Sequence, residues 1–160
     1  MVEEFFLKLE VLLTRRSRPT DHECMLWAGT LDKWGYGTIK LRMPDGKRRH
    51  STAHRAAYML NHHIIDIEKY NKTGSRLEVS HLCHCKSCLN PDHLVLEPGP
   101  TNLERKMCKK SGVCIGHNPE CMLQVRSINP SYFNNYFVKV KLHINDKREQ
   151  LRPLIKHSIS

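Results

Sequence analysis

The segment SHLCHCKSCLNPDHL, residues 80–94, is the feature that most restricts how this chain can fold. It contains three cysteines and three histidines within fifteen positions. A structural zinc ion takes four ligands in a tetrahedron, so these six side chains exceed what one ion can bind. We therefore ask which of them hold a metal and which stay free for chemistry.

Cysteine usage in the whole chain favours metal ligands over disulfides. The chain has seven cysteines, an odd number that argues against a regular disulfide framework. The opening residues MVEEFFLKLEVLL contain no small-residue cleavage site, so we expect no secretory signal and an intracellular, reducing environment. In that environment, cysteines interspersed with histidines predict zinc sites.

Ligand spacing predicts two such sites. Cys108, Cys114, His117 and Cys121 form a compact set of four that needs no further ligand. In the earlier segment, Cys83, Cys88 and His93 supply three ligands, and a turn at Asn90-Pro91 would fold the histidine back towards the cysteines.

The fourth ligand of the earlier site has two candidates. Cys24 is distant in sequence and would be recruited by the fold, whereas Cys85 is two residues from Cys83 and would face the same way on an extended segment. We favour Cys24. Two closed sites would each contribute on the order of 10 kcal/mol to folding, which suits a chain with only four Phe and two Trp.

Two side chains near these ligands could carry chemistry. His81 lies on a predicted strand two residues before Cys83, so a zinc loop would fix its backbone and leave its imidazole available as a general base. Asn102 follows Thr101, which with Glu104 forms a capping-box pattern and predicts a helix beginning at Thr101. The amide oxygen of Asn102 could bind a hard cation such as Mg²⁺. The alternative is that both residues have only structural roles.

The charge of the chain indicates a polyanionic partner. Lys and Arg number 26 against 16 acidic residues, a formal net charge of +10. No apolar run is long enough to cross a bilayer, so nucleic acid is a better candidate than membrane.

A β-hairpin is predicted over residues 34–52, with Pro44-Asp45-Gly46 as its turn. Alternation places Ile39 and Leu41 on one face and cationic side chains on the other. Such a ribbon fits a DNA major groove, although an ordinary solvated face has the same pattern. The candidate DNA-binding residues are Lys40, Arg42, Lys47, Arg48 and Arg49.

These elements predict an α+β fold in a single domain, residues 1–160. An amphipathic helix is expected within residues 1–18, the hairpin and a short helix capped by Ser51 or Thr52 within 24–79, and the zinc-bound part with the candidate active site within 80–121. A strand and tail are expected within 131–160.

The order strand, histidine, zinc loop, strand, helix, with the sequence SHLCH…C…NP.HL…N…C, resembles the His-Cys box homing endonucleases. These belong to the ββα-metal (His-Me finger) nucleases, and the resemblance is to the small enzymes encoded by mobile introns in nuclear ribosomal DNA. It implies a zinc-stabilised ββα-metal fold with a DNA-binding hairpin and little conventional core. It also implies two zinc ions, one on Cys24, Cys83, Cys88 and His93 and the other on Cys108, Cys114, His117 and Cys121.

The resemblance further implies an activity. The chain would be a site-specific endonuclease that cuts double-stranded DNA, with His81 as the general base, Asn102 as ligand of one catalytic Mg²⁺ or similar ion, and Arg49 at the scissile phosphate. Arg48 and Arg42 remain alternatives for that arginine. A homodimer in the nucleus is implied as well. Two other interpretations stay open: a non-specific nuclease of the same type, and a zinc-dependent DNA-binding regulator without activity.

Overall fold

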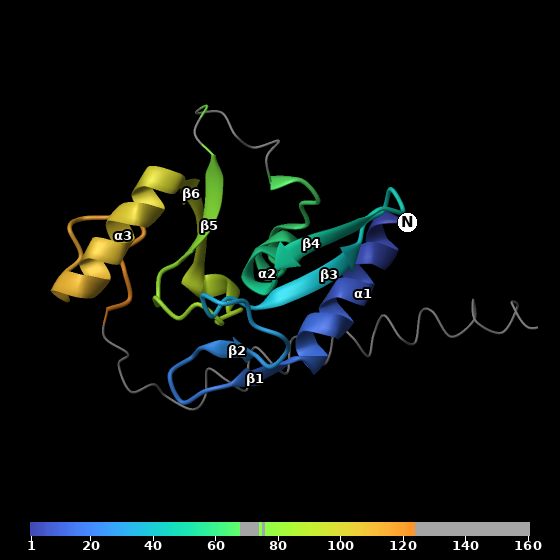
Figure 1. The fold of residues 1–160 in the computed structure, drawn as a ribbon, viewed down its shortest axis with the longest axis horizontal. Coiled ribbons are helices and arrows are strands. Elements are labelled where there is room, and N and C mark those ends of the chain that lie inside the picture. The colour runs from blue at the N-terminus through green and yellow to red at the C-terminus, as the bar shows by residue number, and fades with distance from the viewer. Residues whose placement is uncertain (68–73, 75, 124–160) are drawn as a thin grey trace, which may run out of the picture. The chain divides into compact units, whose positions relative to one another are not determined.

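The computed structural model describes residues 1–67, 74 and 76–123. Helices and small antiparallel sheets alternate along the chain, which confirms the predicted α+β class (Figure 1). In chain order the elements are α1 (Val2–Arg15), β1 (Ser17–Pro19), β2 (Met25–Trp27), β3 (Thr38–Arg42), β4 (Arg48–Thr52), α2 (Ala53–His62), β5 (Leu77–His81), the 3-10 helix η2 (Pro91–His93), β6 (Leu94–Pro98) and α3 (Gly99–Ser111).

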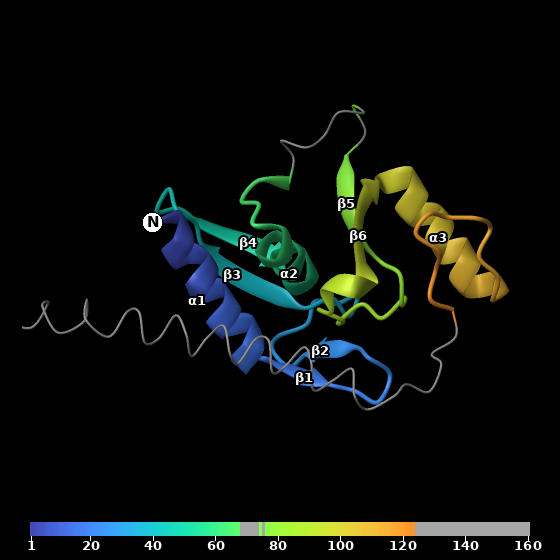
Figure 2. The same ribbon diagram turned by 180° about the vertical axis from the view of Figure 1, so that it is seen from behind.

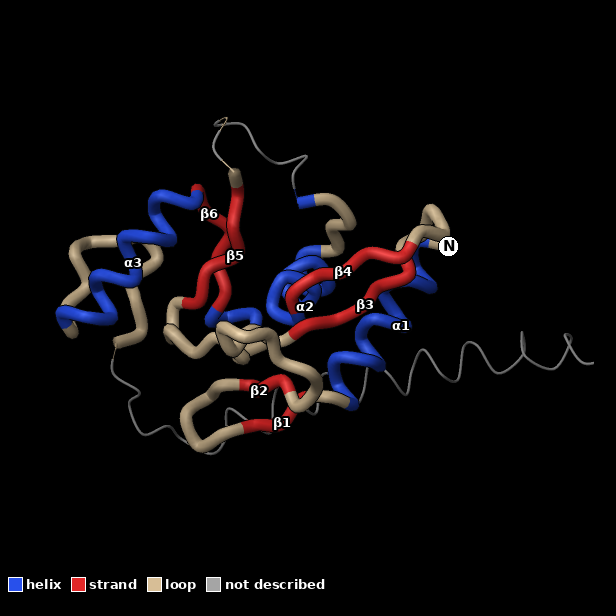
Figure 3. The backbone as a smooth tube through the Cα atoms, in the orientation of Figure 1, coloured by secondary structure: helices blue, strands red, loops and turns tan. Residues whose placement is uncertain are grey.

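The six described strands form three separate two-stranded sheets, each antiparallel (Figure 3). The pairs are β1 with β2, β3 with β4, and β5 with β6. The β3–β4 pair is the predicted hairpin. The β5–β6 pair followed by α3 gives the strand–strand–helix order that the sequence predicted around the candidate active site.

The apolar core is built from side chains of α1, α2, β3, β5 and β6. Figure 2 shows these elements from behind. Helix α1 buries Phe5, Phe6 and Leu9 at helical spacing. On β3, Ile39 and Leu41 are buried while the alternate cationic side chains are exposed, as predicted from the pattern. The hairpin therefore rests on the core and presents its charge to solvent.

Trp27 organises the loop that joins β2 to β3. Its ring is 3% exposed, and its indole nitrogen donates a hydrogen bond to the carbonyl of Thr30 at 3.1 Å. Gly29 and Gly37 pack against this ring. A Cβ atom at Gly29 or Gly37 would come within 2.5 or 2.6 Å, respectively, of ring atoms. The loop is thus held against a buried indole at both of its ends.

Helix α3 corrects one prediction from the sequence. It begins at Gly99, two residues before Thr101, and makes no side-chain capping hydrogen bond. Pro100 lies in its first turn, where the fixed φ of proline is already helical and no backbone N–H is needed. Asn102 is therefore inside the first turn rather than at its first residue. Likewise, Thr52 occupies the N-cap of α2 without a side-chain cap bond.

The buried side chains of α3 are Arg105 and Cys108, neither of which is an aliphatic core residue. This end of the molecule therefore lacks a conventional apolar core. All described elements lie in one compact unit that comprises residues 1–126. A second unit, residues 127–160, lies outside the described residues, as does the strand predicted within 131–160; the single domain stays a prediction. No helix in the described part of the chain is long and apolar enough to cross a membrane.

Candidate zinc sites and active site

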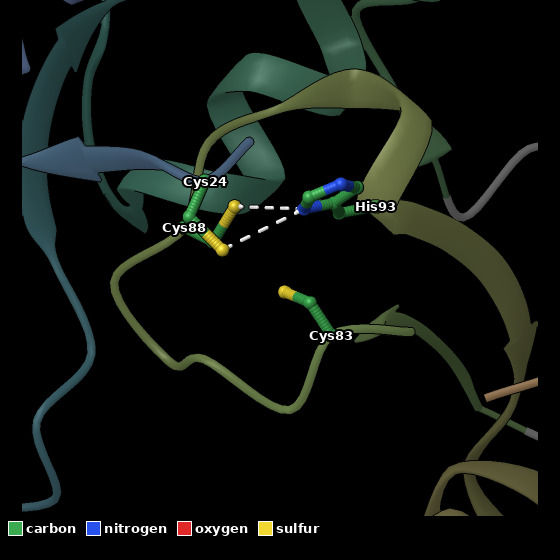
Figure 4. Close-up of side chains that lie close together, drawn as sticks. All are labelled: Cys24, Cys83, Cys88 and His93. Carbon is green, nitrogen blue, oxygen red and sulfur yellow. Dashed lines mark hydrogen bonds between the residues drawn. The ribbon is translucent and has the colours of Figure 1, made fainter. Parts of the chain in front are cut away.

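The first cluster of metal-binding side chains joins three separate parts of the chain. Cys24 precedes β2, Cys83 and Cys88 lie in the loop after β5, and His93 ends η2 (Figure 4). One ligand atom from each lies within 4.8 Å of all the others. The Nδ1 atom of His93 is 3.7 Å from the sulfur of Cys24 and 3.5 Å from that of Cys88.

These separations fit zinc. Zn–S bonds of about 2.3 Å and Zn–N bonds of about 2.0–2.1 Å, at tetrahedral angles, place a ligand nitrogen and sulfur about 3.6 Å apart. The distances found here bracket that value. All seven cysteines, each in the described part of the chain, are free thiols. Three thiols and one imidazole that converge without a disulfide form a Cys3His zinc-binding site.

Backbone pairing explains how Cys24 reaches this site. Strand β2 lies along the zinc loop: the N–H of Leu89 donates to the carbonyl of Met25 at 2.6 Å, and that of Trp27 donates to Ser87 at 2.8 Å. This contact places Cys24, the residue just before β2, beside Cys88.

Asn90 completes the arrangement by turning the chain into η2. Its amide nitrogen donates to the carbonyl of Glu23 at 2.8 Å, and its oxygen accepts from the N–H of Asp92 at 3.1 Å. The predicted turn at Asn90-Pro91 therefore folds His93 back onto the cysteines.

The second cluster is local in sequence. Cys108 lies near the end of α3, and Cys114, His117 and Cys121 follow in the loop after it. The Nδ1 atom of His117 lies 3.4, 3.5 and 3.8 Å from the sulfurs of Cys108, Cys114 and Cys121. These distances again match a tetrahedral zinc site. Gly112 ends the helix with a φ of 73°, a left-handed conformation that turns the loop back towards Cys108.

A carboxylate lies behind each ligand histidine. The Nε2 atom of His93 is 3.9 Å from Glu23, and that of His117 is 3.6 Å from Glu104. In zinc proteins a carboxylate partner orients the imidazole and increases its basicity. At these separations neither pair is hydrogen-bonded, and the Nε2 atom of His117 has no hydrogen-bond partner among the described residues, so each carboxylate neighbours its histidine without holding it.

Arg105 links the second cluster to strand β6. The side chain is 1% exposed and donates three hydrogen bonds to the buried carboxylate of Glu97, at 2.8, 2.9 and 3.0 Å. Its Nη1 atom donates to the carbonyl of Pro119 and to the sulfur of Cys121, at 2.9 and 3.4 Å. One guanidinium therefore fixes α3, β6 and the second zinc loop together.

Cys85 is outside the four-residue set of the first cluster. Its sulfur lies 3.8 Å from the hydroxyl of Ser87. Hydrogen bonds with Cys83, Cys85 and Cys88 raise the pKa of Cys24, and hydrogen bonding to Cys24 lowers the pKa of Cys85 to about 6 and that of Cys88 to about 4. The ligand atoms that lie within 4.8 Å of one another are those of Cys24, Cys83, Cys88 and His93, so the geometry selects Cys24 rather than Cys85 as the fourth ligand.

His81 ends strand β5 and belongs to neither cluster of the described residues. Its side chain is 8% exposed, and its Nε2 atom lies 3.1 Å from the carbonyl oxygen of Cys88. Burial lowers its pKa, an effect partly opposed by the nearby Cys83. The imidazole is thus neutral at neutral pH and is held by a zinc ligand without binding the metal itself.

Two neighbours of His81 were not identified from the sequence. The ring centre of His54 is 4.4 Å from that of His81, and the ring centre of Tyr36 is 6.1 Å away. His54 is buried, and its Nδ1 atom has no hydrogen-bond partner. Burial, and to a lesser extent the neighbouring His81, lowers the pKa of His54 to about 3. These residues come from a loop and from α2, so sequence spacing carries no signal of their proximity.

Asn102 faces strand β5. Its amide nitrogen donates to a carboxylate oxygen of Glu78 at 2.6 Å. Glu78 is three residues before His81 on the same strand. Glu78 was also not identified from the sequence. The structure thus connects Asn102 to the strand that carries His81, with a carboxylate between them.

The predicted DNA-contacting side chains are all exposed, although the pairing of Leu41 with Arg49 places Arg49 on the face of the hairpin opposite Arg42 and Arg48. Arg49 forms a surface ion pair with Asp45 at 3.2 Å. The others, Lys40, Arg42, Lys47 and Arg48, are exposed along β3, the turn and β4.

The fold and the two clusters define a class of small α+β proteins stabilised by paired Cys3His zinc sites. A family model described as the zinc-binding loop region of homing endonuclease matches residues 23–136, and the chain belongs to this family. Membership indicates a nuclease that binds DNA. Comparisons with curated proteins and with solved structures found no match.

Proposed function

We propose that the chain is a site-specific endonuclease that cuts double-stranded DNA with the help of a divalent metal ion. The observation that carries this proposal is the position of His81. It lies two residues before the zinc ligand Cys83, belongs to neither metal-binding cluster of the described residues, and its Nε2 atom is 3.1 Å from the carbonyl oxygen of Cys88. This position leaves the imidazole of His81 available as the rigid base that a hydrolase needs.

The contact with Cys88 determines which nitrogen of His81 can act. A carbonyl oxygen only accepts hydrogen bonds, so Nε2 must carry the proton in the neutral ring. Nδ1 then has the free lone pair and accepts the proton of an attacking water. Because burial lowers the pKa of His81, the ring is unprotonated and ready at neutral pH.

Asn102 would hold the divalent ion. An amide oxygen is a ligand that Mg²⁺ accepts, and the amide nitrogen of Asn102 is fixed by its hydrogen bond to Glu78 at 2.6 Å. When bound, the ion would stabilise negative charge on the leaving 3′ oxygen. Asn102 would turn its amide oxygen to the ion, and Glu78 would orient that amide.

Arg49 is proposed to contact the scissile phosphate, with Arg48 and Arg42 as alternatives. A guanidinium binds phosphate oxygens through paired donors. The ion pair of Arg49 with Asp45 is exposed, so DNA could replace it at little cost. The exposed cations of the hairpin would position the duplex and read its bases.

A homodimer acting in the nucleus is part of the same proposal and is supported by the resemblance of the Cys/His-rich segment described above. Two identical active sites related by a two-fold axis would suit cleavage of both strands of a pseudopalindrome. Sedimentation of the zinc-loaded chain tests this, since a monomer at micromolar concentration would contradict it.

The activity is tested by incubating the zinc-loaded chain with a mixed plasmid library and Mg²⁺. Discrete fragments with 5′-phosphate ends are expected. A smear would instead indicate the second candidate, a non-specific nuclease, which the general cationic surface of the hairpin also suits. Intact DNA that is shifted in a gel would indicate a regulator without catalysis.

A further inference from the structure

Trp34 is an unusual surface residue. Its side chain belongs to the loop between β2 and β3 and is 62% exposed, whereas Trp27 on the neighbouring strand is 3% exposed. An exposed indole keeps a large apolar face in contact with water, so this face contributes no burial energy to the stability of the isolated chain.

The loop around Trp34 is firmly held. One carboxylate oxygen of Asp32 accepts hydrogen bonds from the backbone N–H groups of Trp34 and Tyr36, both at 2.9 Å. The N–H of Gly35 donates to the carbonyl of Asp32 at 3.0 Å, and Gly35 has a φ of 88°, which favours glycine. The exposed indole is thus presented by an ordered turn.

Two lysines accompany the indole. The ammonium group of Lys33 lies 4.3 Å from the ring centre of Trp34, within the range of a cation–π contact. Lys86, from the first zinc loop, donates to the carbonyl of Trp34 at 2.9 Å. Its ammonium group also lies 5.4 Å from the ring centre of Tyr36. The surface therefore combines an aromatic face with two positive charges.

This surface adjoins the candidate active site. Tyr36 is two residues after Trp34, and its ring centre lies 5.5 Å from that of His54 and 6.1 Å from that of His81. Because Lys86 lies over the Tyr36 ring and that ring neighbours His81, the nucleotides beside a phosphate at His81 would pass along the Trp34 turn.

From this arrangement we propose that the indole of Trp34 stacks on a base of bound DNA next to the phosphate at His81. The inference rests on the proposed endonuclease function. Aromatic side chains flanked by lysines match a nucleotide, because the cations attract phosphates and every base has a face for stacking. In a duplex, such a side chain acts at a base step that is locally opened or kinked.

Intrinsic fluorescence tests the contact directly, because the chain has only two tryptophans and Trp27 is buried. The background is the zinc-loaded His81→Ala chain, which should bind DNA without cutting it. A short mixed-sequence duplex labelled with fluorescein serves as the probe, with Mg²⁺ present. Binding is followed by anisotropy of the labelled duplex, and tryptophan emission is followed with the unlabelled duplex.

Duplex binding should quench tryptophan emission in the Trp34-containing chain and leave it unchanged in Trp34→Phe, where Trp27 alone emits. Trp34→Ala should bind roughly tenfold more weakly, and Trp34→Phe, which keeps a stacking ring, within about threefold of the parent. Val2→Ala, which trims an exposed apolar residue on α1, is the matched control and should bind like the parent.

The outcomes separate the two proposals. If the parent chain does not bind the duplex, the proposed function fails and this inference fails with it. If the parent binds but Trp34→Ala binds equally well, or affinity falls without quenching of the indole, only the stacking proposal is overturned. Quenching that persists in Trp34→Phe would also overturn it.

Discussion

The imidazole rings of His54 and His81 lie 4.4 Å apart, centre to centre, on α2 and at the end of β5. His54 is buried with a pKa of about 3, mainly because burial disfavours its charged form. His54 is therefore neutral at neutral pH, and its uncharged ring packs beside the candidate base His81.

This arrangement predicts acid sensitivity. In the unfolded chain a histidine titrates near pH 6.5. Above that pH His54 is neutral in both states and its contribution to stability is complete. As the pH falls below 6.5, the unfolded chain gains a proton that the folded chain does not accept until about pH 3. His54 alone should therefore cost about 1 kcal/mol of unfolding free energy between pH 7 and about pH 5.5.

Urea unfolding of the zinc-loaded chain at these two pH values measures the effect. His54→Gln should show a smaller loss than the parent chain, by about 1 kcal/mol. His62→Gln, at an exposed histidine of the same helix, is the control and should behave like the parent. Zinc content is measured at both pH values, so that loss of metal is not mistaken for titration. Equal losses in parent and His54→Gln would contradict the prediction.

Removal of the candidate base should separate cleavage from binding. His81→Ala should reduce the cleavage rate by about 10²–10⁴-fold, the usual contribution of general-base catalysis, and leave the affinity for DNA unchanged. Gel-based cleavage assays and anisotropy measure the two quantities. His62→Ala should cleave normally. An unchanged cleavage rate in His81→Ala would remove His81 from its proposed role.

The zinc content should distinguish the two cysteines considered for the first site. The intact chain should bind two zinc ions, Cys24→Ser should bind one tightly, and Cys85→Ser should still bind two. Atomic emission after gel filtration counts the ions. A value near one for the intact chain, or loss of an ion in Cys85→Ser, would refute the eight-ligand arrangement.

Arg105 should be essential to the stability of the α3 region. Arg105→Met leaves the Glu97 carboxylate buried without its partner, which typically costs about 3–5 kcal/mol. The same change removes the hydrogen bond to Cys121, so the second zinc should also dissociate faster to a chelator. Lys106→Met, at an exposed neighbour, is the control. Adding Glu97→Gln to Arg105→Met should restore part of the stability, and a double variant as unstable as the single one would contradict the buried-charge explanation.

The sequence predicted most of the described fold because its signals are local. Alternation of Ile39 and Leu41 with charged residues defined the hairpin, and the short spacing from Cys108 to Cys121 defined the second cluster. The early start of α3 was missed because the capping pattern at Thr101 competes with Pro100, which favours the first helical turn.

Contacts between residues far apart in the sequence were harder to predict from the sequence. Cys24 could be preferred over Cys85, but only the pairing of β2 with the zinc loop explains that choice. His54, Tyr36 and Glu78 reach the neighbourhood of His81 and Asn102 through tertiary packing, and nothing in their local sequence marks them. The catalytic roles of His81, Asn102 and Arg49 stay predictions.

The first zinc site has a consequence for how the molecule acquires its shape. Cys24 and His93 are 69 positions apart, yet both converge on one point. During synthesis, the last ligand of this site emerges from the ribosome long after the first. Closing so large a loop costs conformational entropy, and this cost is offset only when the metal binds. The pairing of β2 with the zinc loop, which also positions His81, should therefore form late in folding. The supply of zinc would then determine what fraction of newly synthesised chains reaches the active fold.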